Sequence, residues 1–310
     1  MRKAFSLIEV IFVMVILGIV ASLSSQIIVQ VYDNYLTQRA LYTTTTKTEM
    51  VANQIVNRLT FAIDNTRISK VVNPDGTYNG GVTKGTDWIP LNEIGANPNF
   101  TTVEWIGYDN DSFAAGATPY WSGVANYETA TRNSFESPGS NFSNVATIMN
   151  NLSDGEVDLT TKPAAIIFAQ QVNEYSDGLE YSPACMGLID ETNTTCIARV
   201  TKNSDTNLSL MDNRPVIVTE RYKMAWSAYA IVPELNAKTN LYDLYLYYNY
   251  QPWNQETYKD DASKSLLMKN ISVFKFTENG GVIQFKLCAT ENIGADYNIS
   301  SCKEKAIIKC

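Results

Sequence analysis

The N-terminal segment constrains the fold most, because it is a long apolar run that contains a single charge. The stretch from Phe5 to Ala21 is almost entirely apolar, and Glu9 is the only charged residue between Lys3 and Asp33. About 20 apolar residues span a bilayer, and a carboxylate at the centre of such a span costs about 2.5–3.5 kcal/mol on insertion scales. The sequence therefore predicts a membrane-spanning helix whose acid has a functional reason.

A cut after Ala4 would supply a partner for that acid. The new amino group of Phe5 would lie about one helical turn from Glu9, on the same chain or on a neighbour. Two basic residues, Arg2 and Lys3, precede the cut. Together these features resemble the class III signal sequence of type IV pilins and type II secretion pseudopilins.

The resemblance implies a set of processing and assembly steps. In that family a prepilin peptidase cleaves on the cytoplasmic side and N-methylates the new terminal residue. This implies cleavage between Ala4 and Phe5, methylation of Phe5, Arg2 and Lys3 as the leader charge, and Glu9 as the residue of subunit assembly. The implied partners are prepilin peptidase, other pilins or pseudopilins, an inner-membrane assembly platform and membrane lipid. The implied location is the inner membrane, crossed once with the C-terminal domain in the periplasm, and then a filament.

Two simpler interpretations compete with this one. An ordinary secretory signal has a short apolar core followed by small residues, as in Val10 to Leu23 and Ala21 to Ser24. A plain membrane anchor fits Phe5 to Gln26 by length. Either would make the chain an exported, single-pass periplasmic binding or interaction protein. Neither accounts for Glu9.

The helix is expected to continue beyond the membrane. No Gly or Pro occurs between Ala21 and Asn73, and apolar residues recur at nearly helical spacing. We therefore predict a helix from Phe5 to about Arg67, ~90 Å long. The recurring residues are Ile27, Val31, Tyr35, Leu41, Met50 or Val51, Ile55, Leu59 and Ile63. The expected organisation is a leader at 1–4, a membrane or filament-core helix at 5–30, its amphipathic continuation at 31–68, and a periplasmic β-rich domain at 69–310.

The remaining sequence predicts an antiparallel sheet packed on the helix, and hence an α+β fold with long loop excursions at 71–101 and 109–162. Gly280 and Gly281 between two alternating runs are a strong hairpin signal. A turn is expected at Pro233 to Asn236, and helical turns at Val145 to Leu152 and Ser265 to Asn270. The predicted strands are 103–108, 164–172, 197–202, 215–221, 222–232, 241–250, 271–277 and 282–287.

Two further stretches extend the resemblance. Ser265 to Phe276 is similar to a leucine-leucine, valine and alternating aromatic stretch of J-type pseudopilins and W-type minor pilins. Val51 to Leu59 is similar to the helix segment that precedes their globular domain. The rest of the domain carries no matching motif.

Composition argues against catalysis and nucleic-acid binding. The chain has no histidine, which excludes Ser-His-Asp and Cys-His catalysis and histidine-ligated zinc. Its formal net charge of −8 is unsuited to non-specific phosphate binding, so no nucleic-acid partner is predicted. Asp109 to Asp111 and Asp154 to Asp158 resemble fragments of calcium loops, but both lack the twelve-residue ligand spacing. No enzyme activity and no cofactor are therefore expected, with calcium at these loops as the weaker alternative.

Five cysteines occur, all in the exported part. Cys185 with Cys196, and Cys288 with Cys302, are candidate disulfides across short loops. Cys310 is left over and is an alternative partner for Cys302, so the connectivity stays open.

Tyrosine and tryptophan are dense in one region. Ten of them lie between Tyr222 and Tyr258. They indicate either a binding face for a subunit or glycan, or the ordinary preference of aromatic residues for strands. The second interpretation is favoured.

Overall fold

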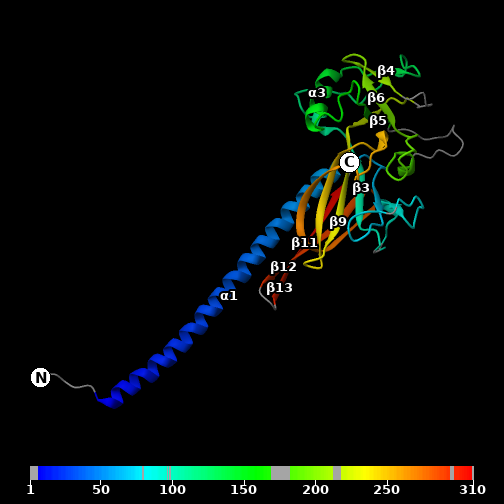
Figure 1. Ribbon diagram of the computed structural model, residues 1–310. Coiled ribbons are helices and arrows are strands. Elements are labelled where there is room, and N and C mark those ends of the chain that lie inside the picture. The colour runs from blue at the N-terminus through cyan, green and yellow to red at the C-terminus, as the bar shows by residue number, and fades with distance from the viewer. Residues whose placement is uncertain are drawn as a thin grey trace.

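The computed structural model describes residues 6–78, 80–95, 97, 99–168, 182–211, 218–293 and 297–308. One long helix projects from a body made mainly of two antiparallel sheets (Figure 1). The predicted α+β class is confirmed.

The helix α1 spans Leu7–Thr60, 54 residues or about 81 Å. It ends seven residues before the predicted position, so that boundary was wrong. The chain leaves the helix because the segment after it joins the sheet: the Ile63 amide donates to the Ile106 carbonyl at 2.8 Å, and the Thr66 hydroxyl accepts from the Ile106 amide at 3.2 Å. Asn65 reverses the chain with a positive φ of 58°. Ile63 lies beyond the end of the helix but continues its apolar spacing, because this turn buries the Ile63 side chain.

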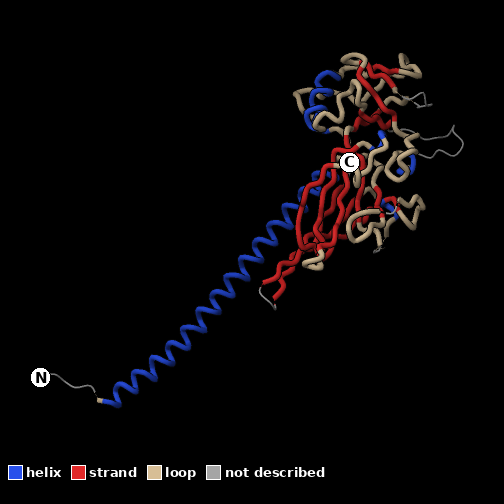
Figure 2. The backbone as a smooth tube through the Cα atoms, viewed as in Figure 1, coloured by secondary structure: helices blue, strands red, loops and turns tan. Residues whose placement is uncertain are grey.

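The larger sheet has eight strands in the order β13-β12-β11-β10-β9-β3-β1-β2. The second half of α1 packs on its β11–β13 side, where Val51, Ala52, Ile55 and Leu59 are buried. Figure 2 shows the helix alongside these strands, with its first half free of the body. The strands are β1 Ile68–Lys70, β2 Trp88–Pro90, β3 Thr102–Gly107, β9 Ser227–Asn236, β10 Leu241–Tyr250, β11 Ser263–Asn279, β12 Val282–Ile293 and β13 Tyr297–Ile308.

Residues 108–226, called the inserted module below, separate two strands that pair directly, β3 and β9. The module holds a five-stranded sheet in the order β4-β7-β6-β5-β8 and lies at the end of the body away from the start of α1 (Figure 1). Its elements are α2 Asn110–Phe113, β4 Ser134–Glu136, α3 Phe142–Leu152, β5 Ala164–Phe168, β6 Ala198–Lys202, β7 Asn207–Leu210 and β8 Tyr222–Ala225. Short 3-10 helices occur at Leu91–Glu93, Pro183–Cys185 and Pro252–Asn254.

The module is fixed to the larger sheet by a shared core and by buried hydrogen bonds. Ile167 of the module packs in one cluster with Val232 of β9. The Asn249 side-chain amide donates to the Ser153 carbonyl at 2.9 Å, and the Trp253 indole donates to the Pro163 carbonyl at 3.3 Å. We infer that module and sheet move as one body.

Several predicted elements need correction. Ser265 to Asn270 is not a helical turn but the first part of β11, which pairs with β10 through a bulge. Pro233 to Asn236 lies inside β9, so the hairpin turn comes later, at 237–240. The long strand β13 was not predicted.

Other predictions agree with the structure. The strand at 241–250 and the hairpin of β11 and β12 are confirmed, and the helical turn at 145–152 is part of α3. The predicted strand 222–232 is divided between β8 and β9 at Trp226, where the chain passes from one sheet to the other. Residues 169–172 and 215–217 of two predicted strands lie outside the described residues.

Both candidate cysteine pairs are bonded in the structure. Cys185 is joined to Cys196 in the inserted module. Cys288 of β12 is joined to Cys302, its direct register partner on β13. Cys310 lies outside the described residues.

Candidate assembly site on the N-terminal helix

Glu9 lies in the first turn of α1. Its carboxylate Oε2 accepts the Ser6 backbone N–H at 3.1 Å, and Ser6 occupies the N-cap position. Ser6 and Glu9 form a capping box, in which the side chain of each residue pairs with the backbone amide of the other. This pairing satisfies amide groups that a helix N-terminus leaves unpaired, and a negative charge is favourable there. Glu9 therefore has a local partner one residue beyond Phe5. Arg2, Lys3, Ala4 and Phe5 lie outside the described residues.

The apolar face of this helix segment has no cover within the described chain. Phe12 is 68% exposed, Met14 69% and Ile28 68%, and residues 7–35 are all exposed. In the described residues α1 is the helix that is long and apolar enough to cross a membrane. A soluble monomer does not leave an apolar surface of this extent in water. Lipid or other helices must bury it.

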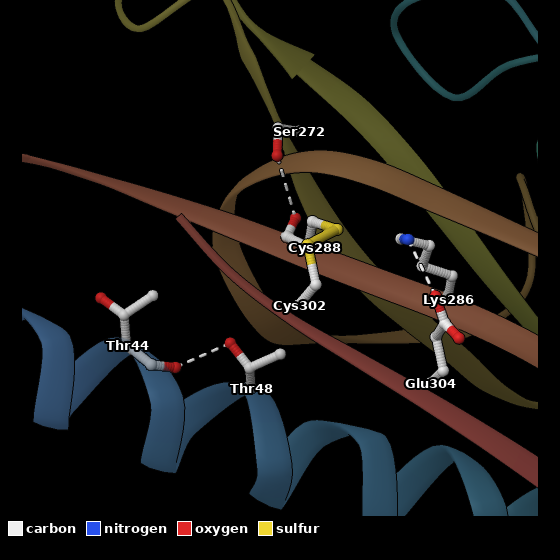
Figure 3. The surroundings of a disulfide bond; sticks show 7 residues. All are labelled: Thr44, Thr48, Ser272, Lys286, Cys288, Cys302 and Glu304. Atoms are coloured by element: carbon white, nitrogen blue, oxygen red, sulfur yellow. Dashed lines mark hydrogen bonds and ion pairs between the residues drawn. A yellow bond between two sulfur atoms is a disulfide. The ribbon is translucent and has the colours of Figure 1, made fainter. Parts of the chain in front are cut away.

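The second half of α1 is held firmly by the body. Thr44 and Thr48 are buried where the helix passes β12 and β13, close to the Cys288–Cys302 disulfide (Figure 3). The Thr48 hydroxyl donates to the Thr44 carbonyl at 2.7 Å. The four-threonine run from residue 43 to 46 lies inside α1, and Thr44 of this run is buried against the sheet.

A charged clamp ties the helix to the last strand. Glu49 contacts Lys305 at 2.5 Å and Lys303 at 3.2 Å. Hydrogen bonds from the Lys305 and Lys303 ammonium groups hold the pKa of Glu49 below its usual value. Sequence reasoning missed this clamp, although the two-residue spacing of the lysines is the signal of one strand face. The clamp and the buried threonines attach the second half of α1 to the body.

A groove of about 1090 Å³ runs beside the second half of α1. Met50, Gln54 and Arg58 line it along the helix, and Tyr229 and Tyr248 lie among the residues from the sheet. The Arg58 guanidinium stands 5.4 Å from the centre of the Tyr229 ring.

The aromatic residues between Tyr222 and Tyr258 act mainly as core. Tyr250, Trp253 and Tyr258 are at most 1% exposed, and of the ten only Tyr242, at 39%, is exposed. The interpretation as strand and core residues accounts for them better than a binding face.

The two acidic stretches use their carboxylates within their own loops. Asp109 caps α2 by accepting the Ser112 amide at 3.0 Å. Asp158 accepts three backbone amides, from Thr160, Thr161 and Lys162, which hold its pKa well below the usual range despite burial. Among the described residues, no group of three or more His, Cys, Asp or Glu side chains is arranged to hold a metal ion.

Comparison with known proteins gives one match. The model of the prokaryotic N-terminal methylation motif matches residues 1–25. No curated protein and no solved structure is significantly similar to the chain. The match covers the segment that contains the predicted cleavage point, Phe5 and Glu9.

Proposed function

We propose that this chain is a minor subunit of a type IV pilus or of a type II secretion pseudopilus. The proposal starts from the N-terminal methylation motif, which is typical of type IV pilins and pseudopilins. The chain is cleaved and N-methylated by prepilin peptidase, and then joins or primes a type II secretion pseudopilus or a type IV pilus. It acts by helix packing, not by catalysis. The observation that carries the proposal is the motif on a helix whose apolar surface is uncovered.

The membrane holds the chain before assembly. Residues 7–27 of α1 are about 31 Å long, which matches the hydrocarbon thickness of a bilayer. Arg2 and Lys3 keep the leader on the cytoplasmic side, so the body lies in the periplasm. In the assembly, the inner-membrane platform brings helices of neighbouring subunits together, and their packing replaces lipid.

Cleavage changes the surroundings of Glu9. Before it, the nitrogen of Phe5 is an uncharged amide in the peptide bond with Ala4, and Glu9 accepts the amide of the next residue, Ser6. After it, Phe5 carries a terminal ammonium within a turn of the carboxylate. An ammonium paired with a carboxylate is far less costly in a bundle of apolar helices than either charge alone. We propose that the amine of a neighbouring subunit takes this place during docking.

The inserted module supports a specialised role over that of a repeating subunit. It contains 15 of the 32 acidic residues and 7 of the 24 basic residues, so it carries the whole formal net charge of −8. It sits at the end of the body farthest from the membrane helix (Figure 1). We propose that this acidic end meets partners outside the helix bundle, and its charge disfavours nucleic acid among them.

Mass spectrometry of the mature N-terminus tests the processing step. We expect N-methylated Phe5 as the first residue in cells that contain prepilin peptidase, and intact Met1 in cells that lack it. A mature chain that begins near Ser24 would instead make it a conventionally exported protein, and an intact Met1 in both strains would make it a plain anchor.

Variants of Glu9 test the docking step. Glu9→Gln keeps an oxygen that can accept the Ser6 amide and removes the charge, whereas Glu9→Ala removes both. We expect both variants to be cleaved and both to be incorporated at least tenfold less than the wild type. Asp33→Asn, an exposed acid on the same helix, is the matched control. Normal incorporation of Glu9→Gln would show that capping, not charge, is what matters.

A further inference from the structure

The last strand of the larger sheet, β13, has one edge with which no described strand pairs. An edge strand presents a row of unpaired backbone N–H and C=O groups, and proteins commonly shorten such strands or interrupt them with a bulge or a proline. At the other edge of this sheet, β2 has three residues and ends in Pro90. β13 has 12 residues without a proline, and its pairing with β12 runs along the whole strand without a register shift.

The disulfide of β13 shows which backbone groups point outward. Cys302 is the register partner of Cys288, and their Cα atoms are 4.0 Å apart. So short a distance is typical of a non-hydrogen-bonded pair, in which the two residues turn their backbone groups away from each other. The Cys288 carbonyl accordingly accepts the Ser272 hydroxyl of β11 at 3.4 Å, on the side away from β13 (Figure 3). The amide and carbonyl of Cys302 therefore face the free edge, as do those of every second residue along the strand.

The residues whose backbone groups point outward also have exposed side chains. The residues between them turn toward α1, where Ser301 and Ile307 are at most 7% exposed. The helix therefore covers one face of β13 and leaves the other face and the free edge open. The outward residues are Asn298, Ser300, Cys302, Glu304, Ala306 and Ile308.

Charges on β13 select the side chains of a strand added at this edge. Lys303 and Lys305 share one carboxylate, that of Glu49, so the helix side of the edge keeps an excess of positive charge. On the other face the Glu304 side chain is 69% exposed. Opposite charges directly across a pair of strands are favourable, and like charges are unfavourable. An added strand is therefore favoured when it places an acid, a base and an acid opposite these three residues.

A second copy of the chain fits this edge poorly. In antiparallel pairing, the more stable arrangement per residue, two β13 strands are related by a two-fold axis normal to the sheet. That axis also reverses the direction of α1, so the two apolar helices would not enter the same membrane. A register centred on Glu304 would place Glu304 against its own copy and Lys303 against Lys305.

We propose that the free edge of β13 binds an extended segment of a different protein as an added antiparallel strand. The segment carries acidic residues opposite Lys303 and Lys305 and a basic residue opposite Glu304. Backbone hydrogen bonds supply the affinity of such a complex, and the alternating side chains supply its selectivity. This contact goes beyond the proposed function, because it requires neither cleavage nor methylation and lies apart from Glu9.

Amide hydrogen exchange, measured residue by residue on the full chain in detergent, tests whether the edge is free. We expect the outward amides of Cys302 and Glu304 to exchange at least tenfold faster than those of Lys303 and Lys305, which bond to β12. Equal protection of both sets would show that the edge is already covered. Protection of the outward amides that grows with protein concentration would make a second copy the occupant. Either result would overturn the proposal.

A synthetic peptide, acetyl-Ser-Ile-Thr-Glu-Lys-Glu-Thr-Val-amide, tests the binding of a strand. At millimolar concentration it should slow exchange of the Cys302 and Glu304 amides at least fivefold. Two control peptides should protect these amides at least fivefold less: one is N-methylated at the residues that face β13, and the other has Lys-Glu-Lys at its centre. No protection by the first peptide, or equal protection by the N-methylated one, would refute strand addition.

A pair of variants separates the backbone from the side chain. Glu304→Pro removes one outward amide and is compatible with an edge strand, whereas Glu304→Ala keeps that amide. We expect Glu304→Pro to abolish protection of Cys302 by the peptide, and Glu304→Ala to preserve most of it. Slow exchange of Lys303 and Lys305 in both variants shows that β13 still pairs with β12. Equal protection in the two variants would contradict the proposal and leave the proposed function standing, because that function depends on the mature N-terminus and on Glu9.

Discussion

Gly107 of β3 and Ser227 of β9 are register partners on adjacent strands, although the whole inserted module lies between them in sequence. The larger sheet would close with a short connection at this point. The module is therefore an addition to a body of helix and sheet that is complete without it. It does not interrupt the backbone pairing of β3 with β9. Its core nevertheless merges with the body's, because Ile106 and Ala228, next to that junction, pack in one cluster with Ile167 of the module.

This shared core predicts that module and body unfold together. Ile167→Ala in the module and Ile231→Ala in the body each remove a side chain that is at most 2% exposed. Each should lower the free energy of unfolding by about 2–5 kcal/mol. Urea denaturation of the full chain in detergent, followed by far-UV and near-UV circular dichroism, should give coincident transitions for the wild type and both variants. Two separated transitions, each shifted by one variant only, would show that the module is independent.

A buried ion pair joins β1 to β3 in the interior of the body. The Lys70 ammonium lies 2.6 Å from Glu104 Oε2, both side chains are at most 4% exposed, and the Tyr250 hydroxyl donates to Glu104 Oε1 at 2.9 Å. Lys70→Met leaves a buried carboxylate without its counter-charge, so we expect a loss of about 3–5 kcal/mol in unfolding free energy. The double variant Lys70→Met/Glu104→Gln should recover at least half of that loss, since glutamine still accepts from Tyr250. A purely additive result in the double-mutant cycle would contradict coupling of the pair.

The Cys288–Cys302 disulfide fixes the sheet edge that receives the helix. It closes a sequence separation of 14 residues between β12 and β13, and Glu49 binds lysines on the same strand. Replacing both cysteines by serine should cost about 3 kcal/mol in the chain-entropy model. Amide hydrogen exchange should accelerate in β13 and in residues 44–52 of α1. The matched variant Cys185→Ser/Cys196→Ser should leave exchange in β13 unchanged, and equal acceleration by both would mean a general loss of stability.

Local patterns revealed the parts of the fold that local interactions specify. The hairpin of β11 and β12 was predictable because Gly280 and Gly281 supply positive φ values between alternating runs. The strand β13 was missed because its side toward α1 carries Ser301, Lys303 and Lys305, so no apolar alternation marks it. Its stability comes from pairing with β12 and packing on α1. Ser265 to Asn270 was misassigned because Asn270, at φ 59°, accompanies a bulge that breaks the alternation.

In the candidate site, too, some features follow from the local sequence and others depend on contacts between distant residues. The processing motif was readable because a peptidase recognises contiguous residues, and Glu9 stands out as the one charge in an apolar run. The clamp joins Glu49 to Lys305, residues 256 positions apart, so only the folded sheet brings them together. No sequence spacing indicates such a pair.

Asp109 gives the module junction a pH dependence. Burial raises the pKa of this carboxyl group to about 6, from about 3.9 in an unfolded chain. The folded protein therefore binds this proton more tightly than the unfolded chain does. The resulting contribution to stability is complete below about pH 4 and is lost as the pH rises to 6 and above, by an amount on the order of 3 kcal/mol.

Asp109→Asn removes this titration and keeps an oxygen that can cap α2. Relative to the wild type, the variant should gain unfolding free energy as the pH rises from 4 to 7 and then stay level. Urea denaturation at half-unit pH steps measures the difference in unfolding free energy between the two proteins. Taking this difference cancels the titrations that both proteins share. Asp111→Asn, at the exposed neighbouring acid, should show no such gain. A constant difference between wild type and Asp109→Asn across this range would mean that Asp109 is already ionised at pH 4, and that the folded junction stabilises its charge.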